Sequence, residues 1–302
     1  MFNTFKSVLF FTMILFFMGC TYHDKDFIPE LTENRYEPLP ENLIAFNDDR
    51  SVSARYVDPT LRYDHGILGD KIEAGGMLVI KNKKEYHYKL DEAFVYEDLR
   101  PRLKDVDNDG ELEFITILTS LNSGAGVCVY KILNGSLRPI AQSGYIGMTH
   151  RWLNIAAVDD LDNDGKVEIA WIQTPHIGGI LKIARIVKDS LLVLDEKEGV
   201  SNHQIGSRNL CLSVVTAHDG SKKLYVPNNP HHAIMGFSFR NDRLIAEDTI
   251  LLNIDPIVPL FMQYNFEHLS EDKNCIYIPA GRLSTENFRG IIRGRLNLDK
   301  PG

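Results

Sequence analysis

Two acidic stretches of nine residues constrain this chain more than any other feature, because both read D-x-D-x-D-G-x-x-E. They cover residues 105–113 and 160–168. Carboxylates crowded into one tight turn repel each other unless a hard cation lies among them, and Ca²⁺ accepts roughly six to eight oxygen ligands in such loops. The glycine at position 6 allows a sharp turn, so that the carbonyl at position 7 can also reach an ion. The pattern predicts two calcium sites, with a solvated acidic turn as the alternative.

Each expected site has four carboxylates and one main-chain carbonyl. The first set is Asp105, Asp107, Asp109, Glu113 and the carbonyl of Glu111, and the second is Asp160, Asp162, Asp164, Glu168 and the carbonyl of Lys166. An EF-hand needs a carboxylate at position 12, where this chain has Thr116 and Trp171. The segments that follow, LEFITIL (112–118) and VEIAWIQ (167–173), are rich in β-branched and aromatic residues. Each loop is therefore expected to precede a strand.

The N-terminus has the features of an export signal. Lys6 precedes the apolar run VLFFTMILFFM (8–18), which is too short to cross about 30 Å of hydrocarbon. Gly19-Cys20 resembles a bacterial lipoprotein box, in which the cysteine is lipidated, and Thr21 after it favours the outer membrane. We expect a signal peptide at 1–20, lipidated Cys20 and a polar, proline-containing tether at 21–41. An ordinary exported protein and an uncleaved anchor are the alternatives.

Composition argues against nucleic acid as a partner and against a disulfide framework. The net charge is −8, with 44% apolar and 25% charged residues, and no basic patch with interleaved aromatics is present. This argues against a nucleic-acid partner. Cys128, Cys211 and Cys275 all lie in apolar, strand-like runs, and their odd number argues against a disulfide framework. We expect free, buried thiols.

The two loops also define a repeat. Units of roughly 50–55 residues, made of short strands joined by turn dipeptides, occur five times between about residue 42 and residue 302. The copies beginning near 212 and 261 keep the rhythm of strands and turns but lack the carboxylates, and His218-Asp219-Gly220 stands in the loop position of the first of them. The repeat predicts an all-β domain over 42–302, a β-propeller of five blades with about four antiparallel strands each. Two packed β-sandwiches are the alternative.

Acidic loops ahead of strands in a repeat of this length resemble the FG-GAP (integrin α-type) and VCBS repeats of β-propeller proteins. Strings such as RYDHGILGD (62–70), TPHIGG (174–179) and NHQIGSR (202–208) are similar to a group of bacterial FG-GAP/VCBS proteins. The resemblance implies a propeller whose loops bind Ca²⁺ within the blades. It implies no activity.

A ligand face is expected where the first strands of the blades line a central channel. Arg151 and Arg208 occupy the same position in two units, and Arg100 is approximately equivalent. With nearby histidines they form a set suited to an anionic or sugar ligand: Arg100, Arg151, Arg208, His65, His176 and His203. The alternative is that each arginine caps carbonyls of a neighbouring blade and each histidine closes its own turn.

Catalytic signatures such as G-x-S-x-G, H-E-x-x-H and the P-loop are missing from the sequence, and no catalytic residue is assigned. We expect a calcium-stabilised binding or interaction module at the bacterial cell envelope, with an envelope protein or glycan as partner. The alternatives are a periplasmic, glycosidase-like enzyme with its site in the propeller channel and a purely structural scaffold.

Overall fold

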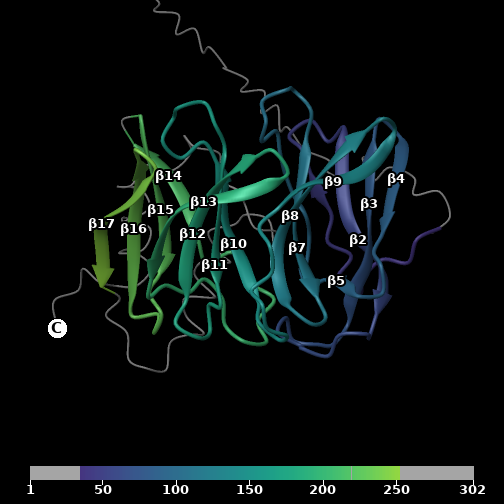
Figure 1. The fold of residues 1–302 in the computed structure, drawn as a ribbon, viewed down its shortest axis with the longest axis horizontal. Helices are drawn as coiled ribbons and strands as arrows, with labels where there is room; N and C mark the ends of the chain where they lie inside the picture. The colour runs from purple at the N-terminus through teal and green to yellow at the C-terminus, as the bar shows by residue number, and fades with distance from the viewer. Residues whose placement is uncertain (1–34, 219, 252–302) are drawn as a thin grey trace, which may run out of the picture. The chain divides into compact units, whose positions relative to one another are not determined.

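The computed structural model describes residues 35–218 and 220–251. The expected signal peptide, lipidated Cys20, Cys275 and the fifth repeat lie outside these ranges. All regular elements in the described part are β-strands, from β1 to β17 (Figure 1). No helix within the described ranges has the length and apolar character needed to span a bilayer.

The strands form four successive antiparallel meanders, which Figure 1 shows in chain order. The first comprises β1 (Ala45–Phe46), β2 (Val52–Thr60), β3 (Glu73–Lys81) and β4 (Lys84–Lys89). The second comprises β6 (Arg102–Lys104), β7 (Glu113–Ser120), β8 (Gly124–Leu133) and β9 (Ser136–Gln142). The third comprises β10 (Leu153–Asp159), β11 (Glu168–Gln173), β12 (Ile180–Val187) and β13 (Ser190–Glu198). The fourth comprises β14 (Val214–His218), β15 (Ser221–Pro227), β16 (Ala233–Arg240) and β17 (Arg243–Leu251).

Thin connections join the first three meanders into one 13-stranded sheet. The short strand β5 (Phe94–Tyr96) pairs with β7 and, through Tyr96 and Ala74, with β3. A single parallel pair, Ser190 and Gln142, links β13 to β9. The fourth meander is a separate four-stranded sheet, and the large sheet does not close on itself within the described residues.

The hydrophobic cores lie between consecutive meanders. On β7, Phe114 and Leu118 pack into the core that contains Tyr56 of the first meander, whereas Ile115 and Ile117 pack into the core shared with the third. The third meander likewise contributes alternate β11 residues to two cores, one of them shared with the fourth. A sandwich sheet buries one face against its partner, so burial of both faces argues against the two-sandwich alternative. Face-to-face stacking is consistent with propeller blades.

The hairpin turns lie where the dipeptides predict them. Asn82-Lys83 and Asn241-Asp242 both have positive φ at the two turn positions, with values between 52° and 64°. This backbone twist suits two-residue hairpins, and asparagine, aspartate and glycine adopt it at low cost. The two segments expected to follow the acidic loops form β7 and β11, which confirms the predicted strands.

One glycine sets the packing of a loop near the candidate ligand face. A Cβ on Gly179 would lie 1.6 Å from the carbonyl oxygen of Val200, and Gly179 has a φ of +58°. The Gly199 amide donates to the Gly179 carbonyl at 2.9 Å. Only glycine allows this contact, which holds the loop carrying His176 against the segment leading to His203.

Of the two cysteines in the described residues, one is a free thiol as expected and the other is not. Cys128 is free and buried in β8, as predicted. Cys211 is disulfide-bonded, so the prediction of a free thiol there is wrong. An odd number of cysteines argues against complete pairing but leaves room for one pair. Cys211 also lies before β14, which begins at Val214, rather than within a strand.

Candidate metal-binding loops and a buried histidine cluster

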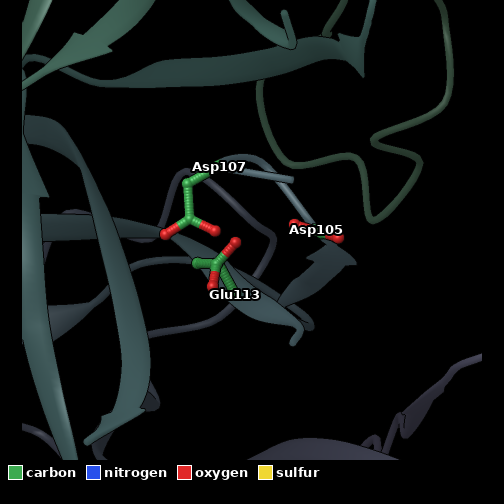
Figure 2. Close-up of side chains that lie close together, drawn as sticks. All are labelled: Asp105, Asp107 and Glu113. Atoms are coloured by element: carbon green, nitrogen blue, oxygen red, sulfur yellow. The ribbon is translucent and has the colours of Figure 1, made fainter. Parts of the chain in front are cut away.

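Both acidic loops lead into the second strand of a meander, the first between β6 and β7 and the second between β10 and β11. Three carboxylates of the first loop, Asp105, Asp107 and Glu113, each offer an oxygen within 4.8 Å of the others. Figure 2 shows the carboxylates of Asp107 and Glu113 facing each other, with Asp105 beside them. The second loop groups Asp160, Asp162 and Glu168 in the same way. An all-oxygen carboxylate donor set suits a hard cation such as Ca²⁺.

The loops share one backbone design. Gly110 and Gly165 both have a φ of +87°, and a Cβ atom on either would meet nothing within 4 Å, so backbone conformation rather than space requires glycine. The Gly110 amide donates to Asp105 Oδ2 at 2.9 Å, and the Gly165 amide donates to Asp160 Oδ2 at 3.0 Å. These bonds orient the first carboxylate of each loop.

The last acidic residue of each loop is buried at the start of a strand. Glu113 and Glu168 are both fully buried. One oxygen of each accepts a backbone N–H at 2.8 Å, from Val106 and Leu161 respectively. Burial raises the pKa of both carboxyls, to about 7 for Glu168. A buried carboxylate needs a cationic partner to remain charged.

A basic side chain that the sequence patterns did not single out enters each cluster. Lys131 of β8 places Nζ 2.7 Å from Asp107, 2.8 Å from Asp109 and 2.7 Å from Glu113. In the second loop, Arg185 of β12 holds the corresponding carboxylates. Its Nη2 lies 3.2 Å from Asp162 and 3.1 Å from Asp164, and its Nε donates to Glu168. The available signal was a basic residue inside a short apolar run, Lys131 in VCVYKI and Arg185 in IARI.

Asparagine side chains connect the loops of successive meanders. Asn108 Nδ2 donates to the Gly165 carbonyl at 2.6 Å, and Asn163 Nδ2 donates to the Gly220 carbonyl at 2.9 Å. The second loop therefore contacts Gly220 in the same way that the first loop contacts Gly165. This repeated contact supports the alignment of His218-Asp219-Gly220 with the acidic loops.

The three candidate histidines gather around Trp152 and Glu97. His65 Nδ1 lies 2.6 Å from a Glu97 carboxylate oxygen, and the indole N–H of Trp152 donates to the Glu97 carbonyl at 2.9 Å. The rings of His176 and His203 lie 6.1 and 4.6 Å from the Trp152 ring. Trp152 is buried in the core between the second and third meanders.

The two inner histidines are neutral. Burial lowers the pKa of His176 to about 4 and that of His203 to about 3. The Nε2 of His203 lies 2.8 Å from the Ser207 carbonyl, which can only accept, so this nitrogen carries the proton. His203 Nδ1 then accepts from His176 Nε2 at 2.9 Å.

Several residues of this cluster were missed from the sequence. The Tyr63 ring stacks on His150 at 5.1 Å, and its hydroxyl accepts the His150 amide at 2.7 Å. Glu73 and Glu97 are buried, and burial raises the pKa of both carboxyls, to about 10 for Glu73. The adjacent acids Glu97 and Asp98 at the end of an apolar strand were the available signal.

The three candidate arginines have local contacts. Arg208 pairs with Glu41 and Asp70. Arg151 Nη1 donates to the His150 carbonyl at 3.1 Å, which places Arg151 beside the histidine cluster. The Arg100 carbonyl accepts from Arg102.

One family model and several solved structures are similar to parts of this chain. Similar solved structures include a hypothetical selenium-binding protein from Sulfolobus tokodaii, with a TM-score of 0.45 and 10% identity over 68% of this chain and 53% of that chain. A rhamnogalacturonan lyase from Bacillus licheniformis has a TM-score of 0.36 and 14% identity over 63% of this chain and 43% of that chain. The alignments thus span about half of those proteins. No curated protein matches the sequence. A family model described as an FG-GAP-like repeat matches residues 105–171, the segment that holds both acidic loops.

Proposed function

We propose that this chain is an exported, calcium-stabilised β-propeller that serves as a binding module at the bacterial cell envelope, with an envelope protein or glycan as partner. The carrying observation is the pair of acidic loops with the same fold inside an FG-GAP-like repeat. Lipidation at Cys20 would tether the domain to a membrane, and the five-blade count and the outer-membrane location belong to the same proposal.

The charge of each loop supports calcium. In the first loop, four carboxylates face one ammonium, that of Lys131, so three negative charges remain to be balanced. Asp105 Oδ1 is buried and has no hydrogen-bond partner among the described residues. A buried carboxylate oxygen without a partner is costly, and a cation would satisfy it. Asp105, Asp107, Asp109, Glu113 and the Glu111 carbonyl would hold one ion, and Asp160, Asp162, Asp164, Glu168 and the Lys166 carbonyl the other.

The histidine cluster supports ligand binding. Its inner residues are buried, but the His150 side chain is 44% exposed and lies beside Asp64, which is 70% exposed. Histidine and tyrosine rings combine flat apolar faces with hydrogen-bonding groups, a combination suited to sugars and planar ligands. His150 would form the accessible part of such a site, with the rings of Tyr63 and His65 packed against it.

Calcium is expected to raise the unfolding midpoint of the purified protein by roughly 5–10 °C when it is present at about 100 times its Kd. The shift arises because Ca²⁺ binds the folded loops and not the unfolded chain. The measurement is thermal unfolding with calcium and then with chelator. Asp105→Ala/Asp160→Ala should abolish the shift, and Asp48→Ala, at an exposed turn, should retain it. An unchanged wild-type midpoint would refute the calcium assignment.

A second function, a carbohydrate-active enzyme, is favoured by the buried carboxylates. Glu73, with a pKa of about 10, stays protonated at neutral pH, while Glu97 is paired with His65. Glycoside cleavage needs a carboxyl group that is still protonated at the working pH, and a raised pKa provides one. If this function is correct, envelope polysaccharides incubated with the protein should yield products, and Glu97→Gln should reduce the rate at least about 100-fold. Glu92→Gln, at an exposed position, is the control and should retain the rate. If the wild type yields no product, the enzymatic function is excluded for the polysaccharides tested.

A further inference from the structure

We propose that Lys131 and Arg185 are intramolecular counter-ions that compete with Ca²⁺ for the two acidic loops and thereby set the calcium affinity of each. The inference rests on the proposed calcium binding and adds the residues that regulate it. In the metal-free protein, each basic side chain holds its loop together. Calcium has to displace it.

The contacts of Lys131 carry the first step. Its Nζ lies within 2.8 Å of three carboxylates, and its side chain is 7% exposed. The ammonium donates a hydrogen bond to Asp107 and forms ion pairs with Asp109 and Glu113. This is the arrangement that neutralises an acidic loop without metal.

The second loop repeats this arrangement with a different side chain. Arg185 extends from β12 as Lys131 does from β8, and each precedes the next hairpin turn by the same spacing. Its guanidinium contacts Asp162, Asp164 and Glu168, the counterparts of the three acids held by Lys131. Because the same arrangement occurs in both loops, these contacts are not accidental surface ion pairs.

The geometry prevents Ca²⁺ and the Lys131 ammonium from occupying the first loop together. Ca²⁺ binds carboxylate oxygens at about 2.3–2.6 Å, close to the 2.7 Å that separates Nζ from Asp107 and Glu113. These two residues also belong to the grouped oxygens of the loop, so an ion bound there would need the oxygens that Nζ holds. Two positive charges that share these oxygens repel strongly in a partly buried site.

Both basic side chains have other surroundings that could accommodate them away from the carboxylates. Lys131 lines a cavity of about 550 Å³ together with Tyr86 and Glu111, so its ammonium can turn away from the loop. Arg185 Nη1 lies 3.5 Å from Asp242, and its guanidinium lies 5.7 Å from the centre of the Phe239 ring. Displacement by calcium would therefore leave neither charge buried without a partner.

The experiment measures calcium binding to the purified full chain by titration calorimetry. Lys131→Met keeps the apolar stem and removes the charge, so one of the two sites should bind Ca²⁺ at least about tenfold more tightly than in the wild type, while the unfolding midpoint in chelator falls. Arg185→Met should do the same for the other site. Lys81→Met is the matched control: it removes one positive charge beside Glu111 and lines the same cavity, and it should leave the affinity within about twofold.

The outcomes separate the two proposals. The competition would be overturned if the wild type binds calcium and neither Lys131→Met nor Lys131→Gln binds it more tightly. That result would leave the calcium function intact. Lys131→Gln also covers the case in which the methionine variant does not fold. Binding by the variants but not by the wild type would support the competition, since the counter-ion then excludes the metal, but it would refute calcium as a ligand of the wild-type protein. No calcium binding by any variant would overturn both proposals.

Discussion

Trp152→Ala is expected to destabilise the folded protein by about 3–5 kcal/mol, a large effect for a single substitution. The Trp152 side chain is 2% exposed and fills the core between the second and third meanders. Its N–H also donates to the Glu97 carbonyl, so the substitution leaves a cavity and an unpaired buried acceptor. Because Trp152 also supports the rings of His176 and His203, the histidine cluster should loosen as well.

Urea unfolding measures this change directly. Trp152→Phe retains an aromatic ring but loses the hydrogen bond, so its cost should be smaller than that of alanine. Leu192→Ala removes an apolar side chain that is 53% exposed and should change stability by less than about 0.5 kcal/mol. A cost below about 1 kcal/mol for Trp152→Ala would show that this core does not depend on the indole.

Between pH 7.5 and pH 5, His176 and His203 are expected to lower the stability of the fold as the pH falls, whereas the raised pKa of Glu73 acts in the opposite direction. The pKa values of the two histidines are about 4 and 3 in the folded state, against 6.5 as the ordinary value. Below pH 6.5 the unfolded chain binds protons at these histidines that the folded protein refuses, so their contribution to stability falls as pH decreases. Buried His203 should contribute about 2 kcal/mol at pH 5, and half-buried His176 less because solvent screens it, for a total of roughly 2–4 kcal/mol.

The test compares unfolding free energies from urea titrations at pH 7.5 and pH 5. His203→Asn removes one of the titrating groups, so the stability at pH 7.5 minus that at pH 5 should fall by about 2 kcal/mol relative to the wild type, even if the variant is less stable at both. His232→Ala, at an exposed turn, should retain the wild-type difference. The same pH difference in His203→Asn as in the wild type would contradict the buried, neutral state of His203.

The features that the sequence predicted correctly depend on residues close together in the chain. The acidic loops draw their shape from nine consecutive residues, with glycine at the sixth position, where φ is positive. The hairpins at Asn82 and Asn241 and the strands after each loop follow from local turn chemistry and alternating side chains. The disulfide at Cys211 was missed because pairing depends on proximity in space rather than on a count of cysteines.

The candidate sites were only partly predictable. His65, His176 and His203 were chosen as histidines expected near the arginines at repeated positions, and the structure brings them to Trp152 and Glu97. No local pattern pointed to Trp152, and the only signal for Glu97 was its position beside Asp98 at the end of an apolar strand. Each is a buried residue whose role comes from its neighbours on other meanders.

The sequence alone determined the repeat, the acidic loops and the all-β class, because hydrophobic alternation, turn residues and carboxylate spacing act over short distances. Only the tertiary structure decided which charge meets which. Lys131 and Arg185 reach their loops across paired strands, from β8 to the loop before β7 and from β12 to the loop before β11. Strand register places these side chains on the face where the carboxylates lie, and the low dielectric of the packed meanders makes the pairing matter.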